Sequence, residues 1–145
     1  NLGTNHEVNA DGENYVAYAF AEVQGFSKFG TYEGNGNADG PFVYTGFKPA
    51  WTMIKSIDNT YNWVIQDRER FGGINSGATD KNLAANSSSA EPSSASFSGN
   101  QIDYLSNGFK LRSNAGNTNA SETYIYMAFA ESPFVSSEGV PTTAK

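Results

Sequence analysis

The sequence contains no cysteine, one histidine and nine basic residues among 145. Without cysteine there can be no disulfide, thiolate zinc site or cysteine nucleophile. Fifteen acids against those nine scattered lysines and arginines give a net charge of −6, which argues against a nucleic-acid partner because phosphate binding needs clustered basic side chains. Since no apolar run approaches the ~20 residues that span a bilayer, no membrane partner is expected either.

The composition also gives little support for a catalytic function. The only histidine, His6, lies in a polar stretch without a Gly-x-Ser-x-Gly context, so a nucleophilic triad is not expected. A pair of carboxylates for glycoside hydrolysis stays open, because the separation of the acids is unreadable from sequence. Glu22 and Glu131 are the best-placed acids, yet each ends an equivalent predicted strand, which favours a structural role. We therefore expect a protein that is not an enzyme.

An internal repeat is the most informative feature of the chain. Residues 13–22 are E-N-Y-V-A-Y-A-F-A-E and residues 122–131 are E-T-Y-I-Y-M-A-F-A-E, at one constant offset of 109 positions. Duplication on the scale of a domain is typical of arrays and fibres. The sequence therefore predicts three parts: residues 1–24 as a lead-in with a spare strand, from a preceding module or donated to a neighbour, residues 25–134 as a complete module, and residues 135–145 as a linker or arm.

The composition favours strands joined by turns, because glycine, asparagine, serine and aromatic residues are abundant. Alternating runs every 8–12 residues predict an all-β, jelly-roll-like sandwich of eight or nine short antiparallel strands with long loops. Residues 14–21 are apolar on both parities, so this strand is expected inside a sheet covered on both faces. The other expected strands are residues 26–33, 41–45, 50–57, 62–67, 81–85, 102–105, 109–112 and 124–131.

Two short motifs suggest binding or modification. Asn35, Asn37 and Asp39 copy the first half of a calcium loop, but glycine stands where the bidentate acid belongs, so a hairpin turn is the preferred interpretation and calcium the alternative. Asn86 and Asn119 each begin a glycan-acceptor pattern in a predicted loop.

Aromatic residues on neighbouring predicted strands offer a second kind of site. Trp51, Trp63, Tyr61 and Tyr44 could form a platform on which sugar rings stack, and the two tryptophans are expected near each other. Packing inside the sandwich is the stronger interpretation of the same residues, because alternating aromatics are first of all core material.

Several motifs together carry a resemblance to a known family. They are Gly25-Phe26-Ser27-Lys28-Phe29-Gly30, Gly34-Asn35-Gly36, Asp39-Gly40-Pro41-Phe42-Val43, Gly46-Phe47-Lys48-Pro49-Ala50-Trp51 and the two copies of the repeat. With these, the chain resembles a domain of unknown function that is widespread in virion and tail-fibre proteins of aquatic bacteriophages, often in tandem. The resemblance implies an extracellular β-rich structural module on a particle or fibre, without catalytic residues.

The spare strand suggests how such a module assembles. An unpaired strand seeks a partner, and donation to the next subunit would bury apolar side chains in a head-to-tail contact that does not close. We expect a non-catalytic fibre or filament subunit whose partner is itself, with surface glycans as a further partner. The alternative is a carbohydrate-binding module of a phage receptor-binding tail protein. The expected assembly residues are Tyr15, Val16, Tyr18, Phe20, Tyr124 and Phe129.

Overall fold

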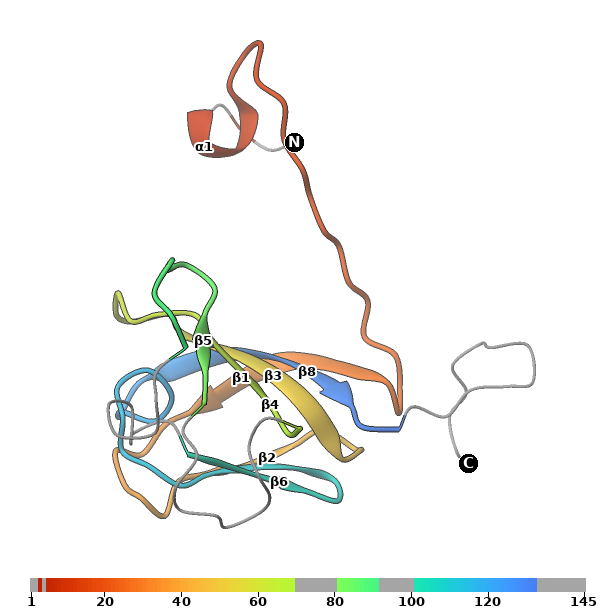
Figure 1. Cartoon of the computed structure of the whole chain (residues 1–145), viewed down its shortest axis with the longest axis vertical. Helices are drawn as coiled ribbons and strands as arrows, with labels where there is room; N and C mark the ends of the chain where they lie inside the picture. Colours follow the sequence, from red (N-terminus) through yellow and green to blue (C-terminus); the bar gives the residue numbers. More distant parts are fainter. Residues whose placement is uncertain (1–2, 4, 70–80, 92–100, 133–145) are drawn as a thin grey trace, which may run out of the picture.

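The computed structural model describes residues 3, 5–69, 81–91 and 101–132, and the predicted linker at residues 135–145 lies outside these ranges. One short helix and eight strands make up the described part of the chain (Figure 1). The elements are α1 (His6–Asn9), β1 (Ser27–Glu33), β2 (Phe42–Tyr44), β3 (Pro49–Ser56), β4 (Val64–Asp67), β5 (Leu83–Ala84), β6 (Ile102–Leu105), β7 (Gly108–Leu111) and β8 (Thr123–Ala130).

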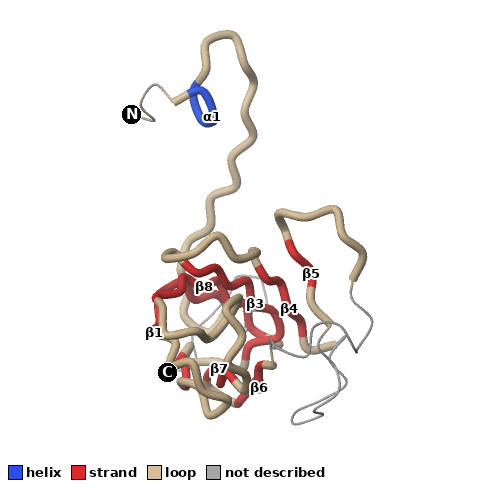
Figure 2. The backbone as a smooth tube through the Cα atoms, turned by 90° about the vertical axis from the view of Figure 1, so that its left-hand side faces the viewer, coloured by secondary structure: helices blue, strands red, loops and turns tan. Residues whose placement is uncertain are grey.

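The strands form two antiparallel sheets that pack face to face. One sheet has five strands in the order β1-β8-β3-β4-β5, and the other has three in the order β2-β7-β6. Figures 1 and 2 show the smaller sheet lying under one face of the larger. The predicted all-β sandwich is thus confirmed, and β3 pairs with β4 and β6 with β7 as antiparallel neighbours in sequence.

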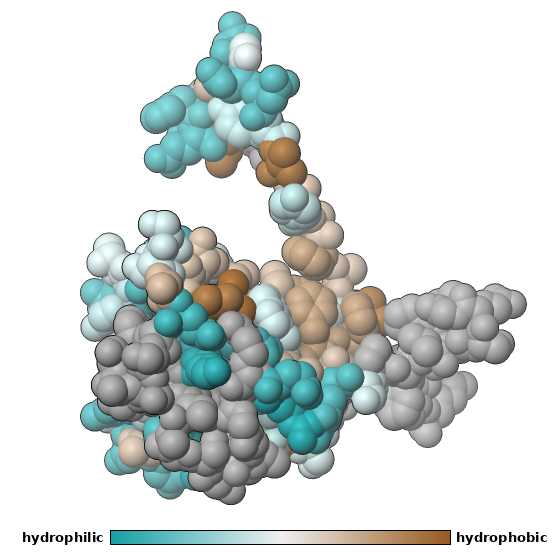
Figure 3. Space-filling view, in the orientation of Figure 1, coloured by the Kyte–Doolittle hydropathy of each residue, from teal (hydrophilic) through white to brown (hydrophobic). Residues whose placement is uncertain are grey.

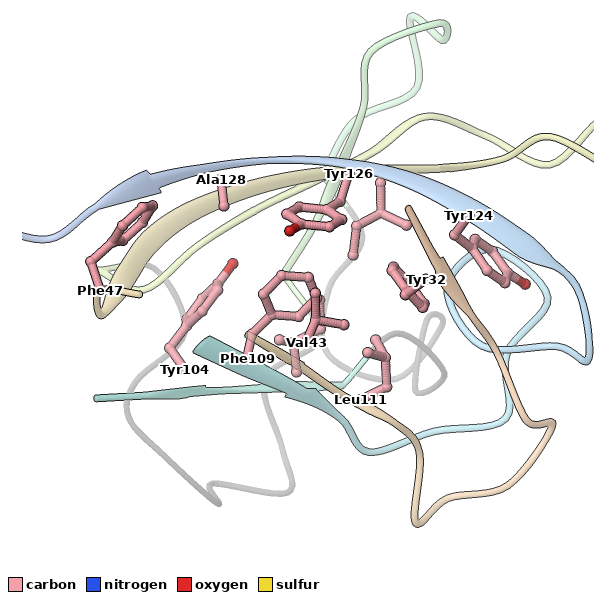
Figure 4. Close-up of a cluster of buried hydrophobic side chains, with 11 residues drawn as sticks. Tyr32, Val43, Phe47, Tyr104, Phe109, Leu111, Tyr124, Tyr126 and Ala128 are labelled. Atoms are coloured by element: carbon pink, nitrogen blue, oxygen red, sulfur yellow. The ribbon is translucent and has the colours of Figure 1, made fainter. Parts of the chain in front are cut away.

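Strand β8, the second copy of the repeat, lies at the centre of the larger sheet between β1 and β3. Its side chains alternate, so that Tyr124, Tyr126 and Ala128 point into the sandwich and are at most 7% exposed (Figure 4). Tyr126 meets the ring of Phe109 from the smaller sheet edge to face, with centroids 5.4 Å apart. Central position and aromatic contacts make β8 the strand on which the core is built.

The first copy of the repeat contradicts its prediction. Residues 13–22 lie in neither sheet but extend away from the sandwich as an unpaired segment (Figure 1). The position between β1 and β3 is filled by β8, the other copy. Apolar patterning favoured a strand at residues 14–21, but a pattern does not specify the pairing partner that a strand needs.

No helix in the described ranges has the length and apolar character needed to cross a membrane.

Candidate functional site

The extended segment at residues 13–22, called the arm from here on, exposes large apolar side chains. Val16 and Tyr18 are 80% and 84% exposed, and Phe20 and Tyr15 follow at 58% and 45%. Figure 3 shows brown and tan atoms along the arm, interrupted by pale teal ones, down to the body of the molecule. Since folded chains rarely leave neighbouring aromatics in water, this exposure makes the arm the candidate functional segment.

The base of the arm is fixed to the sandwich. Phe20 packs against Phe129 and Phe29, with ring centroids 5.9 and 6.5 Å away. Ser27 Oγ donates a hydrogen bond to the carbonyl oxygen of Ala21 at 2.8 Å. Glu22 pairs with Lys28 Nζ at 2.6 Å, and this hydrogen bond raises the pKa of the lysine. The arm therefore leaves the body at a defined point.

The loop that precedes the arm copies the loop that precedes β8. In the sandwich, the Tyr124 hydroxyl accepts from Ala120 N at 2.8 Å and donates to the Gly116 oxygen at 2.7 Å. Ahead of the arm, the Tyr15 hydroxyl accepts from the equivalent Ala10 N at 2.8 Å and donates to the His6 oxygen at 2.5 Å. Both tyrosines thus fasten the chain to its own preceding turn in the same way.

A second pair of equivalent bonds extends the likeness. Asn119 Nδ2 donates to the Ser113 oxygen at 2.7 Å, and Asn9 Nδ2 donates to the Gly3 oxygen at 2.6 Å. Within the sandwich, Asn119 also binds the loop at residues 34–37, accepting from Asn35 N at 3.0 Å. Asn9 is exposed, and none of the described residues from another strand or loop bonds to it. The arm and its loop therefore form a β8 unit that lacks its sheet.

The repeat assigns each arm residue a face. At the constant offset, Tyr15, Ala17 and Ala19 correspond to the core-facing side of β8. Val16, Tyr18 and Phe20 correspond to Ile125, Met127 and Phe129, which lie on the opposite side. The arm is therefore apolar on both faces, as β8 is.

That opposite side, called the outer face, carries an apolar groove of about 540 Å³. Both methionines of the chain lie in it, since Met53 of β3 is the direct cross-strand partner of Met127 of β8. Trp63 and Phe29 line the same groove. Its lining is mostly apolar, so the groove suits apolar contact.

The residues predicted to bind sugar are only partly brought together. Trp51 packs on Phe129 of the outer face, with ring centroids 5.5 Å apart, and lies opposite Asp67 of β4. Trp63 just precedes β4 and borders the groove, so the tryptophans lie toward opposite ends of the β3–β4 pair. Tyr61 lies beside Gly116, and Tyr44 belongs to the smaller sheet. A single platform of all four is therefore not formed.

The loop predicted as a turn or half calcium site is closed by its own hydrogen bonds. Asn35 Oδ1 accepts from Asn37 N at 3.0 Å, and Asn37 Oδ1 accepts from Asp39 N at 2.9 Å. Lys110 Nζ lies 2.9 Å from Asp39, and this contact lowers the pKa of the carboxyl group. The described ranges contain no cluster of three or more His, Cys, Asp or Glu side chains suited to a metal ion. These contacts support the turn interpretation.

The two predicted glycan acceptors differ in their exposure to solvent. Asn86 is exposed in the turn after β5, although its Oδ1 accepts from Trp63 N at 3.0 Å. Asn119 is fully buried and its amide nitrogen is engaged, so the folded chain has no room for a glycan there.

The two acids that end the copies of the repeat both form ion pairs. Glu131 contacts Lys48 at 2.7 Å and also pairs with Arg68. Glu22 pairs with Lys28. Ion pairing at the ends of the two copies agrees with the structural role that the sequence favoured.

The sequence did not single out the loop ahead of the arm as part of the site. Its signal was present in the echo of Asn119-Ala120 by Asn9-Ala10, with one residue inserted afterwards. The methionine pair was also missed, because parity places both residues on one face only after the pairing of β3 with β8 is known.

A family model described as a domain of unknown function (DUF7483) matches residues 1–133. The chain belongs to this family, and the match covers the arm as well as the sandwich. The searches of curated proteins and of solved structures gave no significant match.

Proposed function

We propose that this member of the DUF7483 family is a non-catalytic structural subunit of an extracellular viral or virus-like fibre, joined to its neighbours through the arm. The observation that carries the proposal is the arm itself, an exposed structural copy of β8 and its loop without a sheet of its own. The link to virions and tail fibres comes from the family resemblance of the sequence.

Burial supplies the driving force for such a joint. Fully burying one large apolar side chain is worth about 1.5–3 kcal/mol, and the arm offers Tyr15, Val16, Tyr18 and Phe20. Ordering costs are modest, because the base of the arm is already held by Phe20 and the loop by Tyr15. Because arm and acceptor are different surfaces, the contact is head to tail and extends into a filament.

The proposal is tested on the full-length chain by light scattering over a concentration series, with negative-stain microscopy of the same samples. The double variant Val16→Asp/Tyr18→Asp alters two side chains that are at least 80% exposed, so it leaves the isolated sandwich intact. Tyr44→Asp is the matched control, since Tyr44 is 64% exposed but lies on β2.

We expect concentration-dependent, elongated assemblies from the wild type and from Tyr44→Asp, and monomers from the arm variant. A wild type that stays monomeric at every concentration, or an arm variant that assembles equally well, would refute the proposal.

A carbohydrate-binding module of a receptor-binding tail protein is the second candidate, supported by the position of Trp63 at the groove on the outer face. Glycan binding that is lost in Trp63→Ala or Trp51→Ala, while assembly is unchanged, would favour it. The apolar lining of the groove makes this candidate the weaker one, because sugar sites also need polar groups that fix the ring.

A further inference from the structure

The equivalence between arm and β8 identifies the surface that receives the arm. We infer that the arm occupies the β8 position, between a β1 and a β3 strand, in a neighbouring sandwich of the same family and in the register of β8. This inference rests on the proposed function and names its acceptor.

The loop ahead of the arm argues for this position rather than for a sheet margin. In the sandwich, Asn119 is held by the loop at residues 34–37. Its Nδ2 donates to the backbone oxygen of Asn37 at 2.7 Å, and its backbone oxygen accepts from Gly36 N at 2.9 Å. Asn9 has the same local fold but is exposed. A neighbouring sandwich offers this loop only beside its β8 position, so arm and loop fit there as one unit.

The register follows from the constant offset. Tyr126 lies opposite Gly30 of β1 and Ile54 of β3, so Ala17 takes the place between those two residues in the neighbour. Tyr15, Ala17 and Ala19 then enter the neighbour's core, while Val16 and Tyr18 join its outer face. One parity is thus buried against the smaller sheet, while Tyr18 takes the place of Met127 between Phe29 and Met53.

One difference between the copies sets the preference for a partner. Tyr126 fills the space above Gly30, where an added Cβ would lie 3.0 Å from the tyrosine ring, but the arm carries the smaller Ala17. In a copy of this chain the arm therefore competes with a resident β8 that fits better, so the wild type assembles only as its concentration rises.

Exchanging the core residues of the two strands tests the register in the full-length chain. Tyr126→Ala gives β8 the same three core-facing residues as the arm, and adding Ala17→Tyr gives the arm those of native β8. The matched control is Tyr126→Ala with Ala19→Tyr, because Ala19 corresponds to Ala128, which is 0% exposed and has no room for a ring.

We expect Tyr126→Ala/Ala17→Tyr to assemble at a concentration on the order of tenfold lower than Tyr126→Ala alone, as better core filling requires. Tyr126→Ala/Ala19→Tyr should show no such gain. If Tyr126→Ala by itself unfolds, the circular dichroism signal of the folded state is measured instead. Its recovery on adding Ala17→Tyr, but not on adding Ala19→Tyr, supports the same register.

Equal assembly of Tyr126→Ala/Ala17→Tyr and Tyr126→Ala/Ala19→Tyr would show that the arm does not bind in the register of β8. Should that happen while Val16→Asp/Tyr18→Asp still abolishes assembly, the proposed function stands and only the acceptor is wrong. Should the Val16→Asp/Tyr18→Asp variant assemble like the wild type, the proposed function itself fails.

Discussion

Tyr124 of β8 stacks on Tyr32 of β1 with ring centroids 5.1 Å apart and ring planes 11° from parallel. Burial raises the pKa of Tyr124 to about 12 and that of Tyr32 well above its usual value. The fold therefore favours the neutral phenols, and this contribution is complete below pH 10.

Alkaline pH should weaken the sandwich through this pair. The stabilising contribution of Tyr124 is lost as the pH rises from 10 through about 12, where the phenol ionises in the folded chain. Denaturant unfolding between pH 8 and 12.5 measures the effect, with Tyr124→Phe as the comparison. A wild type and a Tyr124→Phe variant that lose stability in parallel over this range would contradict the assignment.

The equivalent tyrosines should differ in their effect on stability. Tyr124→Phe removes two hydrogen bonds that join β8 to its loop, and we expect it to lower the free energy of unfolding by about 1–3 kcal/mol. Tyr15→Phe removes the same bonds outside the sandwich and should leave that free energy unchanged. Urea titration of both variants decides the point, and similar losses in the two would show that the arm is part of the stable core.

Gly34 should be intolerant of any side chain. A Cβ at this position would lie 2.0 Å from the Ala120 oxygen, so Gly34→Ala must push the chain ahead of β8 away from β1. We expect a loss of about 1–3 kcal/mol. Gly12→Ala serves as the control, because its Cβ meets nothing within 4 Å and its positive φ strains only the loop ahead of the arm. Thermal unfolding of the two variants tests this, and equal midpoints would contradict it.

The ion pair between Asp39, in the turn after β1, and Lys110 should be measurable in solution. The hydrogen bond and the positive charge of Lys110 hold the pKa of Asp39 below its usual value, so any stability from this pair is present above pH 4 and is lost as the pH falls through the lowered pKa. Lys110→Met should raise the pKa of Asp39, as followed by NMR titration of its carboxyl carbon. An unchanged titration would mean that the contact at 2.9 Å does not persist in solution.

The fold was largely predictable because alternation of apolar residues sets the period of each strand. The runs that became β1, β3 and β8 all carried that signal. Sandwich architecture follows from many such short strands.

The position of the arm was not predictable, because its sequence satisfies the same rules as β8. Tyr15 and Tyr124 carry identical local signals, and only the three-dimensional structure shows that one sheet position exists for the two copies. The separation of the tryptophans was unpredictable for a related reason, since Trp51 lies opposite Asp67 at one end of β4 and Trp63 precedes Val64 at the other end.

The most direct test of the account is amide hydrogen exchange across residues 14–21 of the full-length chain, in dilute and in concentrated solution. An arm that joins a neighbouring sheet makes backbone hydrogen bonds along its length, so its exchange should slow by orders of magnitude as assemblies form, and Val16→Asp/Tyr18→Asp should abolish the slowing. Fast exchange of these amides within assembled material would show that the arm is not the joint.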